Sequence, residues 1–336
     1  NFQNAFIAKR YRRISDYPDI FSHVLGYTSR TEDYFNSVPE IPRSHWKDAE
    51  LEYAHGLIRG KTGLEEIYDD LLRGQHGQRV YEMNARGQLL QPLSFIKPKK
   101  GSDLYTNLDI NAQKSAAQFL GNRKGAVVAI DLDSGGINVL YSSPAYSINK
   151  LSNGMTENEF QTLINDQNKP FFNRALQGRY PPASTIKPAI GMYGLLNNIV
   201  SWDFEMKDPG FFTLPETGRI FRGWRKGGHG KVNMHKAFLV SSNAYFFSLA
   251  YQADIVELSD HLSSLGFGQK VCLDCFDEDQ AFVPTPEWKY SLMNAGWVKG
   301  DTVNLGIGQG YLVATPMQLA NYASLLATKG QFTEPS

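Results

Sequence analysis

The sequence predicts an α+β protein of two domains, in which the second domain opens with a strand hairpin and continues with helices. A chain of 336 residues exceeds one average domain. Strand-like runs at 125–131 and 137–142 flank the turn sequence Asp133-Ser134-Gly135-Gly136. Helix-like and loop-rich segments follow, without an alternation of strands and helices. This order is typical of an α+β plan and not of repeated β-α units.

The first hundred residues differ from the rest, and we place the domain boundary near residue 104, between domains 1–104 and 105–336. Hydrophobic spacing, turn residues and helix-ending glycines predict the elements around this boundary. These elements are a helix over 61–72 closed by Gly74, strands at 79–83, 87–90 and 104–108, and an amphipathic helix over 109–120.

Composition and charge exclude several classes of protein. A hydrophobic content of 42% supports a large core. The 34 Lys and Arg residues balance the 34 Asp and Glu residues, which argues against a nucleic-acid binder with a basic surface. No run approaches the roughly 18 to 20 apolar residues of a membrane span, and no signal-peptide pattern opens the chain. Because the chain begins at Asn1 and not at a methionine, the absence of a targeting segment does not decide where the protein is located.

Ser184 stands three residues before Lys187, where proline-rich sequence gives way to an apolar, helix-like stretch over 189–196. Positions i and i+3 of a helix share a face, so the hydroxyl and the amine can come within hydrogen-bond reach. A base beside a serine hydroxyl activates it as a nucleophile, and a helix N-terminus favours developing negative charge. A capping serine and a surface lysine are the ordinary alternative for an isolated pair.

A second pair, Ser241 and Asn243, lies within 236–250, an otherwise apolar and helix-like segment. Two residues apart, these side chains cannot face the same way on a regular helix, but they can converge at a helix end or a turn. Together they offer a proton relay and a donor–acceptor pair for a peptide substrate.

The two pairs lie 57 positions apart, in the order that penicillin-binding proteins and class A β-lactamases use. Five further segments make the likeness specific. They are Asn173–Pro182, Asp208-Pro209-Gly210-Phe211, Gly228-His229-Gly230, Gly306–Gly310 and Ala314-Thr315-Pro316-Met317-Gln318. With them, the whole chain resembles the class B penicillin-binding proteins, in particular the elongation-specific members of Gram-negative bacteria. Residues 56–65 look like the family's non-catalytic pedestal, and 125–144 like the hairpin that opens its transpeptidase domain.

The resemblance implies a penicillin-binding/β-lactamase-like fold, with a central antiparallel sheet flanked by helices and an extended α+β pedestal before it. The implied activity is that of a serine D,D-transpeptidase, without a cofactor, which cross-links peptidoglycan stem peptides during elongation and is a target of β-lactams. Ser184 would attack the carbonyl between two terminal D-alanines, and Lys187 would accept its proton. Ser241 would pass a proton toward the leaving D-alanine, and Asn243 would hold Lys187 and the substrate amide. The N–H of Ser184 would be half of the oxyanion hole.

The resemblance also implies partners and a location. We expect the pedestal to contact a membrane-embedded glycosyltransferase and scaffold proteins of the elongation complex, and we expect no nucleic acid. The catalytic domain would lie in the periplasm, on an inner-membrane anchor that the chain lacks.

Two features depart from the family pattern. Ala183 precedes the nucleophile where the family usually has glycine, and a methyl group there is tolerable. No Lys-Thr-Gly or Lys-Ser-Gly follows Ser241, and we interpret Lys61-Thr62-Gly63 as a coincidental match at the start of a pedestal helix. The strand that carries this third motif is therefore expected beyond Ser336, and the chain as given is expected to be catalytically poor.

Three other functions stay open. A β-lactamase or D,D-carboxypeptidase would use the same serine and lysine, but it would not need residues 1–104, and no deacylating glutamate is identifiable. A β-lactam sensor would bind without turnover, again without a pedestal. A scaffold role of the pedestal is compatible with catalysis.

Metal and disulfide chemistry are weaker hypotheses. Asp208 and His229 could form part of a metal site. Ser242 offers only a hydroxyl where a cysteine thiolate would help to bind the metal, and Gly223 offers no ligand atom. We therefore favour a histidine that orders its loop. Cys272 and Cys275 lack the two further ligands of a structural zinc site. Their segment, 269–276, is predicted to be a strand. An extended segment would separate the two Cα atoms by roughly 10 Å, too far for a disulfide.

Overall fold

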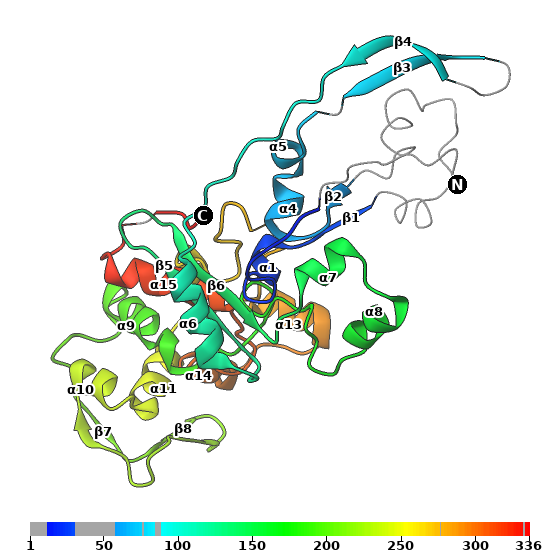
Figure 1. Cartoon of the computed structure of the whole chain (residues 1–336). Helices are drawn as coiled ribbons and strands as arrows, with labels where there is room; N and C mark the ends of the chain where they lie inside the picture. Colours follow the sequence, from blue (N-terminus) through cyan, green and yellow to red (C-terminus); the bar gives the residue numbers. More distant parts are fainter. Residues whose placement is uncertain (1–11, 31–57, 76, 85–88, 276, 332) are drawn as a thin grey trace. The chain divides into compact units, whose positions relative to one another are not determined.

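The computed structural model describes residues 12–30, 58–75, 77–84, 89–275, 277–331 and 333–336 (Figure 1). The chain forms two compact units, one made of residues 1–127 with 138–173, and one made of 128–137 with 174–336. Short helices and two-stranded antiparallel pairs occur in both, which confirms the α+β class. The domain boundary near residue 104 stays a prediction.

The first unit contains short helices and two strand pairs, β1–β2 and β3–β4. Its elements are α1 (Ser22–Leu25), β1 (Thr28–Arg30), β2 (Ile58–Gly60), α4 (Gly63–Ile67), α5 (Asp69–Arg73), β3 (Gln78–Met83), β4 (Leu89–Ile96), α6 (Ile110–Leu120), α7 (Ile148–Asn153) and α8 (Glu157–Ile164).

Three predictions for this unit need correction. The single helix predicted over 61–72 is two helices, because Tyr68 leaves helical geometry (φ −106°, ψ 22°) and ends α4 before α5 begins. The strand predicted at 87–90 is confirmed only as the start of the longer β4, and residues 87 and 88 lie outside the described residues. Residues 104–108 form no strand. The Lys61-Thr62-Gly63 match lies at the start of α4, as predicted.

The amphipathic helix predicted over 109–120 is confirmed as α6. Asp109 caps it, because the side chain accepts from Ala112 N (2.7 Å). On its buried face, the Gln113 carboxamide pairs with the backbone of Leu140, donating to its O (2.9 Å) and accepting from its N (3.0 Å). A fully buried amide thereby satisfies both of its polar ends, which fixes α6 against β6.

The predicted hairpin over 125–142 is confirmed as β5 (Gly125–Ile130) and β6 (Ile137–Ser143). Asp131 N donates to Gly136 O across the turn (2.8 Å). The Asp131 carboxylate also accepts from Ser134 N and Oγ, which is the side-chain turn chemistry that Asp and Ser favour.

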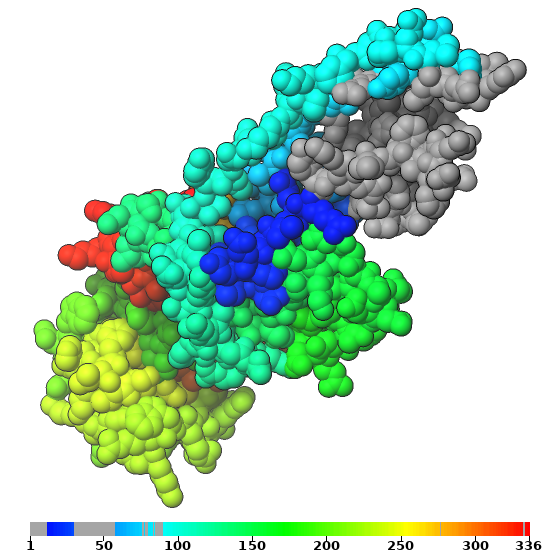
Figure 2. All heavy atoms as spheres, in the orientation of Figure 1, coloured from blue at the N-terminus to red at the C-terminus, as the bar shows by residue number. Residues whose placement is uncertain are grey.

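The second unit adds two strand pairs, β7–β10 and β8–β9, and most of the helices. Its remaining elements are the 3₁₀ turn η2 (Ala183–Ile186), α9 (Lys187–Leu196), β7 (Met206–Asp208), β8 (Phe211–Thr213), β9 (Ile220–Arg222), β10 (Gly230–Val232), α10 (Met234–Leu239), α11 (Asn243–Gln252), α12 (Ile255–Ser264), α13 (Pro286–Met293), α14 (Lys299–Leu305) and α15 (Pro316–Ala327). These two short strand pairs lie on the surface, in the yellow-green part of Figure 2.

The core of this unit holds α9 and α11 together. Ile186, Ile190 and Phe246 are fully buried within one cluster, which Tyr322 of α15 also joins. Burying a large apolar side chain contributes about 1.5–3 kcal/mol, so the cluster fixes these helices firmly. The hydroxyl of Tyr322 accepts from Ala189 N (2.8 Å), which satisfies a donor of the first turn of α9.

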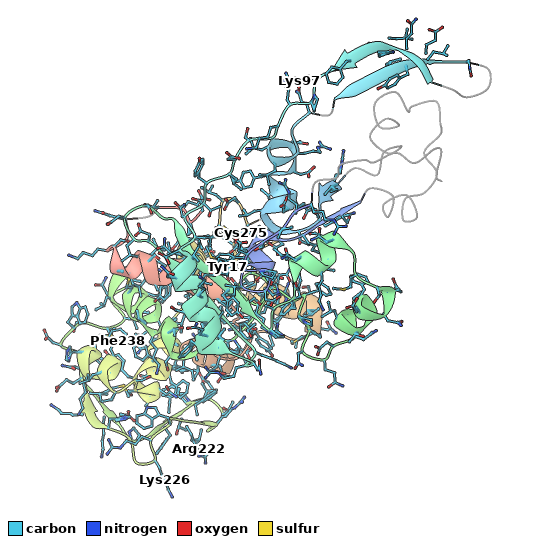
Figure 3. The ribbon with its side chains drawn as sticks, viewed as in Figure 1. Tyr17, Lys97, Arg222, Lys226, Phe238 and Cys275 are labelled. Carbon is cyan, nitrogen blue, oxygen red and sulfur yellow. A yellow bond between two sulfur atoms is a disulfide. The ribbon has the colours of Figure 1, made fainter. Side chains whose placement is uncertain are left out.

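The prediction that Cys272 and Cys275 are not bridged is wrong, because the two residues form a disulfide. Their segment is not a strand, since Leu273 and Asp274 form a turn that brings the two Cα atoms to 5.4 Å. The buried carboxyl of Glu278 accepts from Val271 N (2.8 Å) and Cys272 N (3.0 Å) and supports the turn. Cys275 is labelled in Figure 3.

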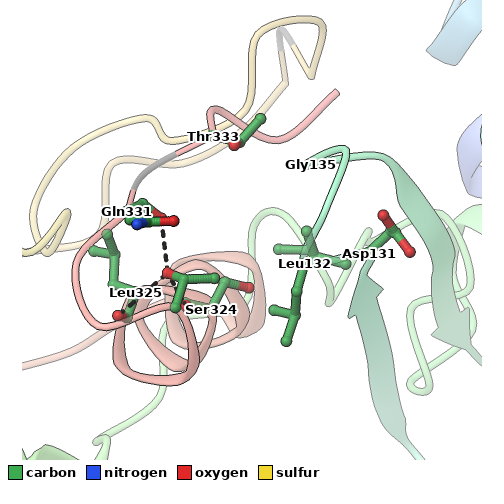
Figure 4. Close-up of a pocket in the computed structure, with 9 residues that line it drawn as sticks. Asp131, Leu132, Gly135, Ser324, Leu325, Gln331 and Thr333 are labelled. Atoms are coloured by element: carbon green, nitrogen blue, oxygen red, sulfur yellow. Dashed lines mark hydrogen bonds between the residues drawn. The ribbon is translucent and has the colours of Figure 1, made fainter.

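A small cavity lies between the β5–β6 turn and α15 (Figure 4). Its lining includes Leu132, Gly135, Leu325 and Thr333. The Thr328 hydroxyl at its edge is already engaged with backbone carbonyls, including that of Gln331 (2.7 Å). Neither the serine–lysine pair nor Ser241 and Asn243 line this cavity. Among the described residues, no helix combines the length and the apolar character needed to span a bilayer.

Candidate active site

Ser184 lies in η2, the single 3₁₀ turn that leads into α9, and its side chain is exposed. Ala183, just before it, has a left-handed backbone (φ 51°), which a glycine would adopt without a steric penalty. The conformation is held by a bond from Ala183 N to Gly308 O (2.9 Å). A Cβ on Gly308 would overlap the Ala183 backbone, so the glycine-rich segment 306–310 allows this close approach. The turn therefore presents the hydroxyl at the surface on a fixed backbone.

Lys187 is the first residue of α9 and is almost completely buried, with 2% exposure. Its Nζ lies 5.3 Å from the centroid of the Phe246 ring. Burial disfavours the charged amine and lowers the pKa of Lys187 to about 8. About one tenth of such an amine is neutral at pH 7, so it can accept a proton there.

Three polar contacts satisfy the buried amine. Lys187 Nζ donates to Asn243 Oδ1 (2.7 Å), to Ser241 Oγ (3.0 Å) and to Ser241 O (3.0 Å). Ser241 Oγ in turn donates to Ser184 Oγ (3.0 Å). The structure thus brings all four predicted residues into one hydrogen-bonded chain.

The expected direct contact between Ser184 and Lys187 is replaced by this relay. Among the contacts of the described residues, no hydrogen bond joins Ser184 Oγ to Lys187 Nζ; the path runs through Ser241. Ser184 lies in a 3₁₀ turn and Lys187 begins the α-helix that follows, and the buried amine is engaged instead by Ser241 and Asn243.

Ser241 and Asn243 converge on Lys187 because the helix predicted over 236–250 is broken between them. α10 ends at Leu239, α11 starts at Asn243, and Ser241 adopts a left-handed backbone (φ 51°). The break turns the Ser241 hydroxyl and the Asn243 carboxamide to one side, as the sequence pattern required.

Asp208 forms hydrogen bonds with both His229 and Ser242, the residue between Ser241 and Asn243. His229 Nδ1 donates to Asp208 Oδ2 (2.9 Å), and Ser242 Oγ donates to the same oxygen (2.7 Å). Gly223 brings no ligand atom. The cluster of possible metal ligands found among the described residues is a different one, Cys272, Asp274 and Cys275, and its two sulfurs are joined in the disulfide. The described contacts of Asp208 and His229 are hydrogen bonds that order their loop.

One residue beside the site escaped the sequence analysis. Trp224 is 65% exposed, and its indole N–H donates to Val240 O (3.2 Å), directly before Ser241. Its ring also lies 5.3 Å from the His229 ring. An exposed aromatic ring fixed beside the serine relay is a ready contact surface for a ligand. The only sequence signal was a tryptophan in a glycine-rich loop, which has no specific meaning by itself.

Comparison with family models accounts for most of the chain. Residues 125–336 match the penicillin-binding protein transpeptidase domain, and residues 1–106 match the penicillin-binding protein dimerisation domain.

Curated relatives agree. The peptidoglycan D,D-transpeptidase MrdA of Acinetobacter baumannii is 40% identical over 334 residues, which are 99% of this chain and 48% of that protein. The protein of the same name from Escherichia coli K12 is 34% identical over 319 residues, which are 95% of this chain and 50% of that protein. The chain spans about half the length of these relatives.

Solved structures show the same fold. The crystal structure of Pseudomonas aeruginosa PBP2 in complex with WCK 5153 matches with a TM-score of 0.82 and 32% identity, over 98% of this chain and 67% of that one. The complex between PBP2 and MreC from Helicobacter pylori contains a chain that matches with a TM-score of 0.83 and 33% identity, over 96% of this chain and 58% of that one. The predicted transpeptidase fold with a pedestal is thereby confirmed.

Proposed function

The chain belongs to the penicillin-binding protein transpeptidase family, and from this premise we propose that it carries the acylation site of a peptidoglycan D,D-transpeptidase active in cell elongation. The observation that carries the proposal is the relay from exposed Ser184 through Ser241 to buried Lys187. A serine acyl-enzyme needs an accessible hydroxyl and a base with a depressed pKa, and both are present.

Acylation begins with attack of Ser184 Oγ on the carbonyl carbon between the two terminal D-alanines of a stem peptide. The serine proton passes to Ser241 Oγ while the proton of Ser241 passes to neutral Lys187. Hydroxyl hydrogens rotate freely, so the two serines can reverse the direction of their hydrogen bonds when Lys187 loses its proton. Protonated Lys187 then returns a proton through Ser241 to the leaving D-alanine nitrogen, and the C–N bond breaks.

Asn243 holds the amine at the relay, because its Oδ1 makes the shortest of the three bonds to Lys187. The backbone N–H of Ser184 provides one donor for the developing oxyanion. An amine of a second stem peptide then attacks the ester and forms the cross-link. β-Lactams acylate Ser184 by the same first step, with the ring amide in place of the peptide bond.

The pedestal, the partners and the location are part of the proposal. We assign residues 1–104 to the pedestal and 105–336 to the transpeptidase domain. Contact with elongation-complex proteins is supported by the Helicobacter pylori structure, which contains PBP2 with MreC. A catalytic domain in the periplasm, on an inner-membrane anchor, follows from a peptidoglycan substrate.

The test is labelling of the purified full-length protein with a fluorescent penicillin, followed by peptide mapping. We expect one adduct, on Ser184, and none in Ser184→Ala. Thr185→Ala removes the neighbouring hydroxyl of the same turn and should still be labelled. An adduct on another residue, or labelling of Ser184→Ala, would refute the proposal.

A second measurement separates transfer from hydrolysis. With the full-length protein, a stem-peptide donor and an amine acceptor, mass spectrometry should detect the cross-linked product. Rapid hydrolysis of penicillin would favour a β-lactamase, and a stable adduct without any peptide turnover would favour a sensor.

A further inference from the structure

We infer that Asp208 and His229 are positioning residues for the Ser241–Asn243 motif, and that they act through the buried hydroxyl of Ser242. The inference rests on the proposed function and adds residues that lie outside the serine–lysine relay. They come from the β7–β10 strand pair: Asp208 ends β7, and His229 directly precedes β10.

The cluster is fully enclosed. Exposure is 0% for Ser242 and 2% for Asp208, and the His229 side chain is 5% exposed. By contrast, the side chains of Arg222 in β9 and of Lys226, between β9 and β10, project away from the ribbon (Figure 3). Buried polar groups are costly unless they are paired, and Asp208, His229 and Ser242 are paired with one another.

The carboxylate of Asp208 is the centre of the cluster. Its Oδ2 accepts from Ser242 Oγ (2.7 Å) and His229 Nδ1 (2.9 Å), and its Oδ1 accepts from Gly210 N (2.7 Å). Burial by itself raises the pKa of Asp208, but these hydrogen bonds outweigh it and lower the pKa below its usual range. Asp208 is therefore an ionised acceptor that holds three donors.

His229 is held by the same contacts. Its Nδ1–H donates to Asp208, and its Nε2 is buried without a hydrogen-bond partner among the described residues. His229 N also donates to Asp208 O (3.2 Å), so backbone and side chain bind the same residue.

Ser242 transmits this anchoring to the relay. It lies between Ser241 and Asn243, and it caps α11 by accepting from Tyr245 N (3.2 Å). The left-handed backbone of Ser241 costs on the order of 1–3 kcal/mol and persists only where the surroundings hold it. The bond to Asp208 fixes Ser242, and with it the direction in which the Ser241 and Asn243 side chains approach Lys187.

The experiment compares two His229 variants by the kinetics of penicillin acylation, separating the binding constant from the acylation rate constant. His229→Leu removes the donor to Asp208, whereas His229→Asn places an N–H close to the position of Nδ1. We expect His229→Leu to lower the acylation rate constant roughly 10- to 100-fold with little change in binding, because misplacement of about 1 Å has effects of this size. His229→Asn should recover most of the rate.

Two further variants complete the set. Asp208→Asn should also slow acylation, because it removes the charge that holds the donors. Lys231→Ala breaks only the exposed ion pair between Lys231 in β10 and Glu205, directly before β7. This variant should acylate at the wild-type rate. Rates are expressed per active site from the final extent of labelling, so a partly unfolded variant does not imitate a slow one.

The outcomes are distinguishable. If wild type is not labelled at Ser184, the proposed function fails. If wild type is labelled and His229→Leu or Asp208→Asn reacts at the wild-type rate, the positioning inference is overturned. It is also overturned if His229→Asn is as slow as His229→Leu, since hydrogen bonding would then not explain the effect.

Discussion

At the scale of single residues, Lys187 combines deep burial with a complete set of hydrogen-bond acceptors. Removing an amine from water favours its neutral form, while the acceptors Ser241 and Asn243 keep it from leaving the site. The net result is the pKa of about 8, which places the neutral base within reach of physiological pH.

The rate of acylation should therefore depend on pH through Lys187. The reactive form is the neutral amine, so the rate constant rises about tenfold per pH unit below 8 and levels off above 8. Stopped-flow labelling with a fluorescent penicillin between pH 6 and 9 measures this rise of the acylation rate constant with pH.

In Lys187→Ala, the acylation rate constant should fall on the order of 10²- to 10⁴-fold, and its rise with pH below 8 should disappear. Lys231→Ala, which changes an exposed lysine, is the matched control and should show the same pH dependence as wild type. If the acylation rate constant of Lys187→Ala depends on pH as in wild type, another group is the base.

At the scale of elements, helix starts and turns position the site more than helix length does. α15 begins with a capping box, in which Thr315 Oγ1 accepts from Gln318 N and Gln318 Oε1 accepts from Thr315 N (3.1 Å each). The Gln318 amide also donates to Gln269 O (2.7 Å) and Gln280 O (2.8 Å). One cap therefore connects α15 to the segment that carries the disulfide.

Thr315→Ala should lower the free energy of unfolding by about 1 kcal/mol, the typical effect of a lost N-cap. Thr315→Ser keeps the acceptor oxygen and should lose much less. Urea unfolding monitored by circular dichroism measures both variants. Equal stabilities of wild type and Thr315→Ala would show that the cap is not stabilising.

The disulfide between Cys272 and Cys275 closes a loop of only four residues. Loop-closure entropy then predicts that Cys272→Ser with Cys275→Ser lowers the free energy of unfolding by about 2 kcal/mol. The loss should stay moderate, because Glu278 still holds two backbone N–H groups of the turn. Urea unfolding measures the change.

Intact mass of the protein, purified without reductant, should lie two hydrogens below the reduced value. A protein at the full reduced mass, with two free thiols, would contradict the bridge. The double serine variant serves as the mass control, since no treatment should change its mass by two hydrogens.

At the scale of the whole molecule, positive and negative charges cancel. Lys plus Arg and Asp plus Glu each number 34, and the isoelectric point is about 7.2. Self-repulsion between copies is weakest where the net charge is zero. The exposed apolar side chains of β4, including Leu93 and Phe95, then face no long-range repulsion from a second copy.

Solubility should therefore pass through a minimum near pH 7 and rise toward pH 5.5 and pH 9. Ammonium sulfate precipitation across this range measures it. Leu93→Lys, on an exposed position of β4, should raise solubility at pH 7. A solubility that changes in one direction only over this range would contradict the charge argument.

Local chemistry allowed much of the protein to be predicted from sequence. Three features depend only on residues within a few positions, so the local sequence is sufficient to predict them. They are the cap of α6 at Asp109, the glycine after α5 at Gly74 and the Asp133–Gly136 turn. The spacing of Ser184 and Lys187 is also a local property, but it did not reveal that Ser241 lies between the two side chains.

Only the tertiary structure decided how distant segments meet. The bond from Lys187 to Asn243 spans 56 positions and depends on how α9 packs against α11, which no short pattern records. The turn at Cys272 replaced a predicted strand because Glu278, six residues on, supplies acceptors that a strand partner would otherwise provide. Sequence by itself determined which chemical groups the protein has and where a local cap fixes a helix start, as at α6. Packing determined which groups touch, because burial and long-range contacts are properties of the folded chain as a whole.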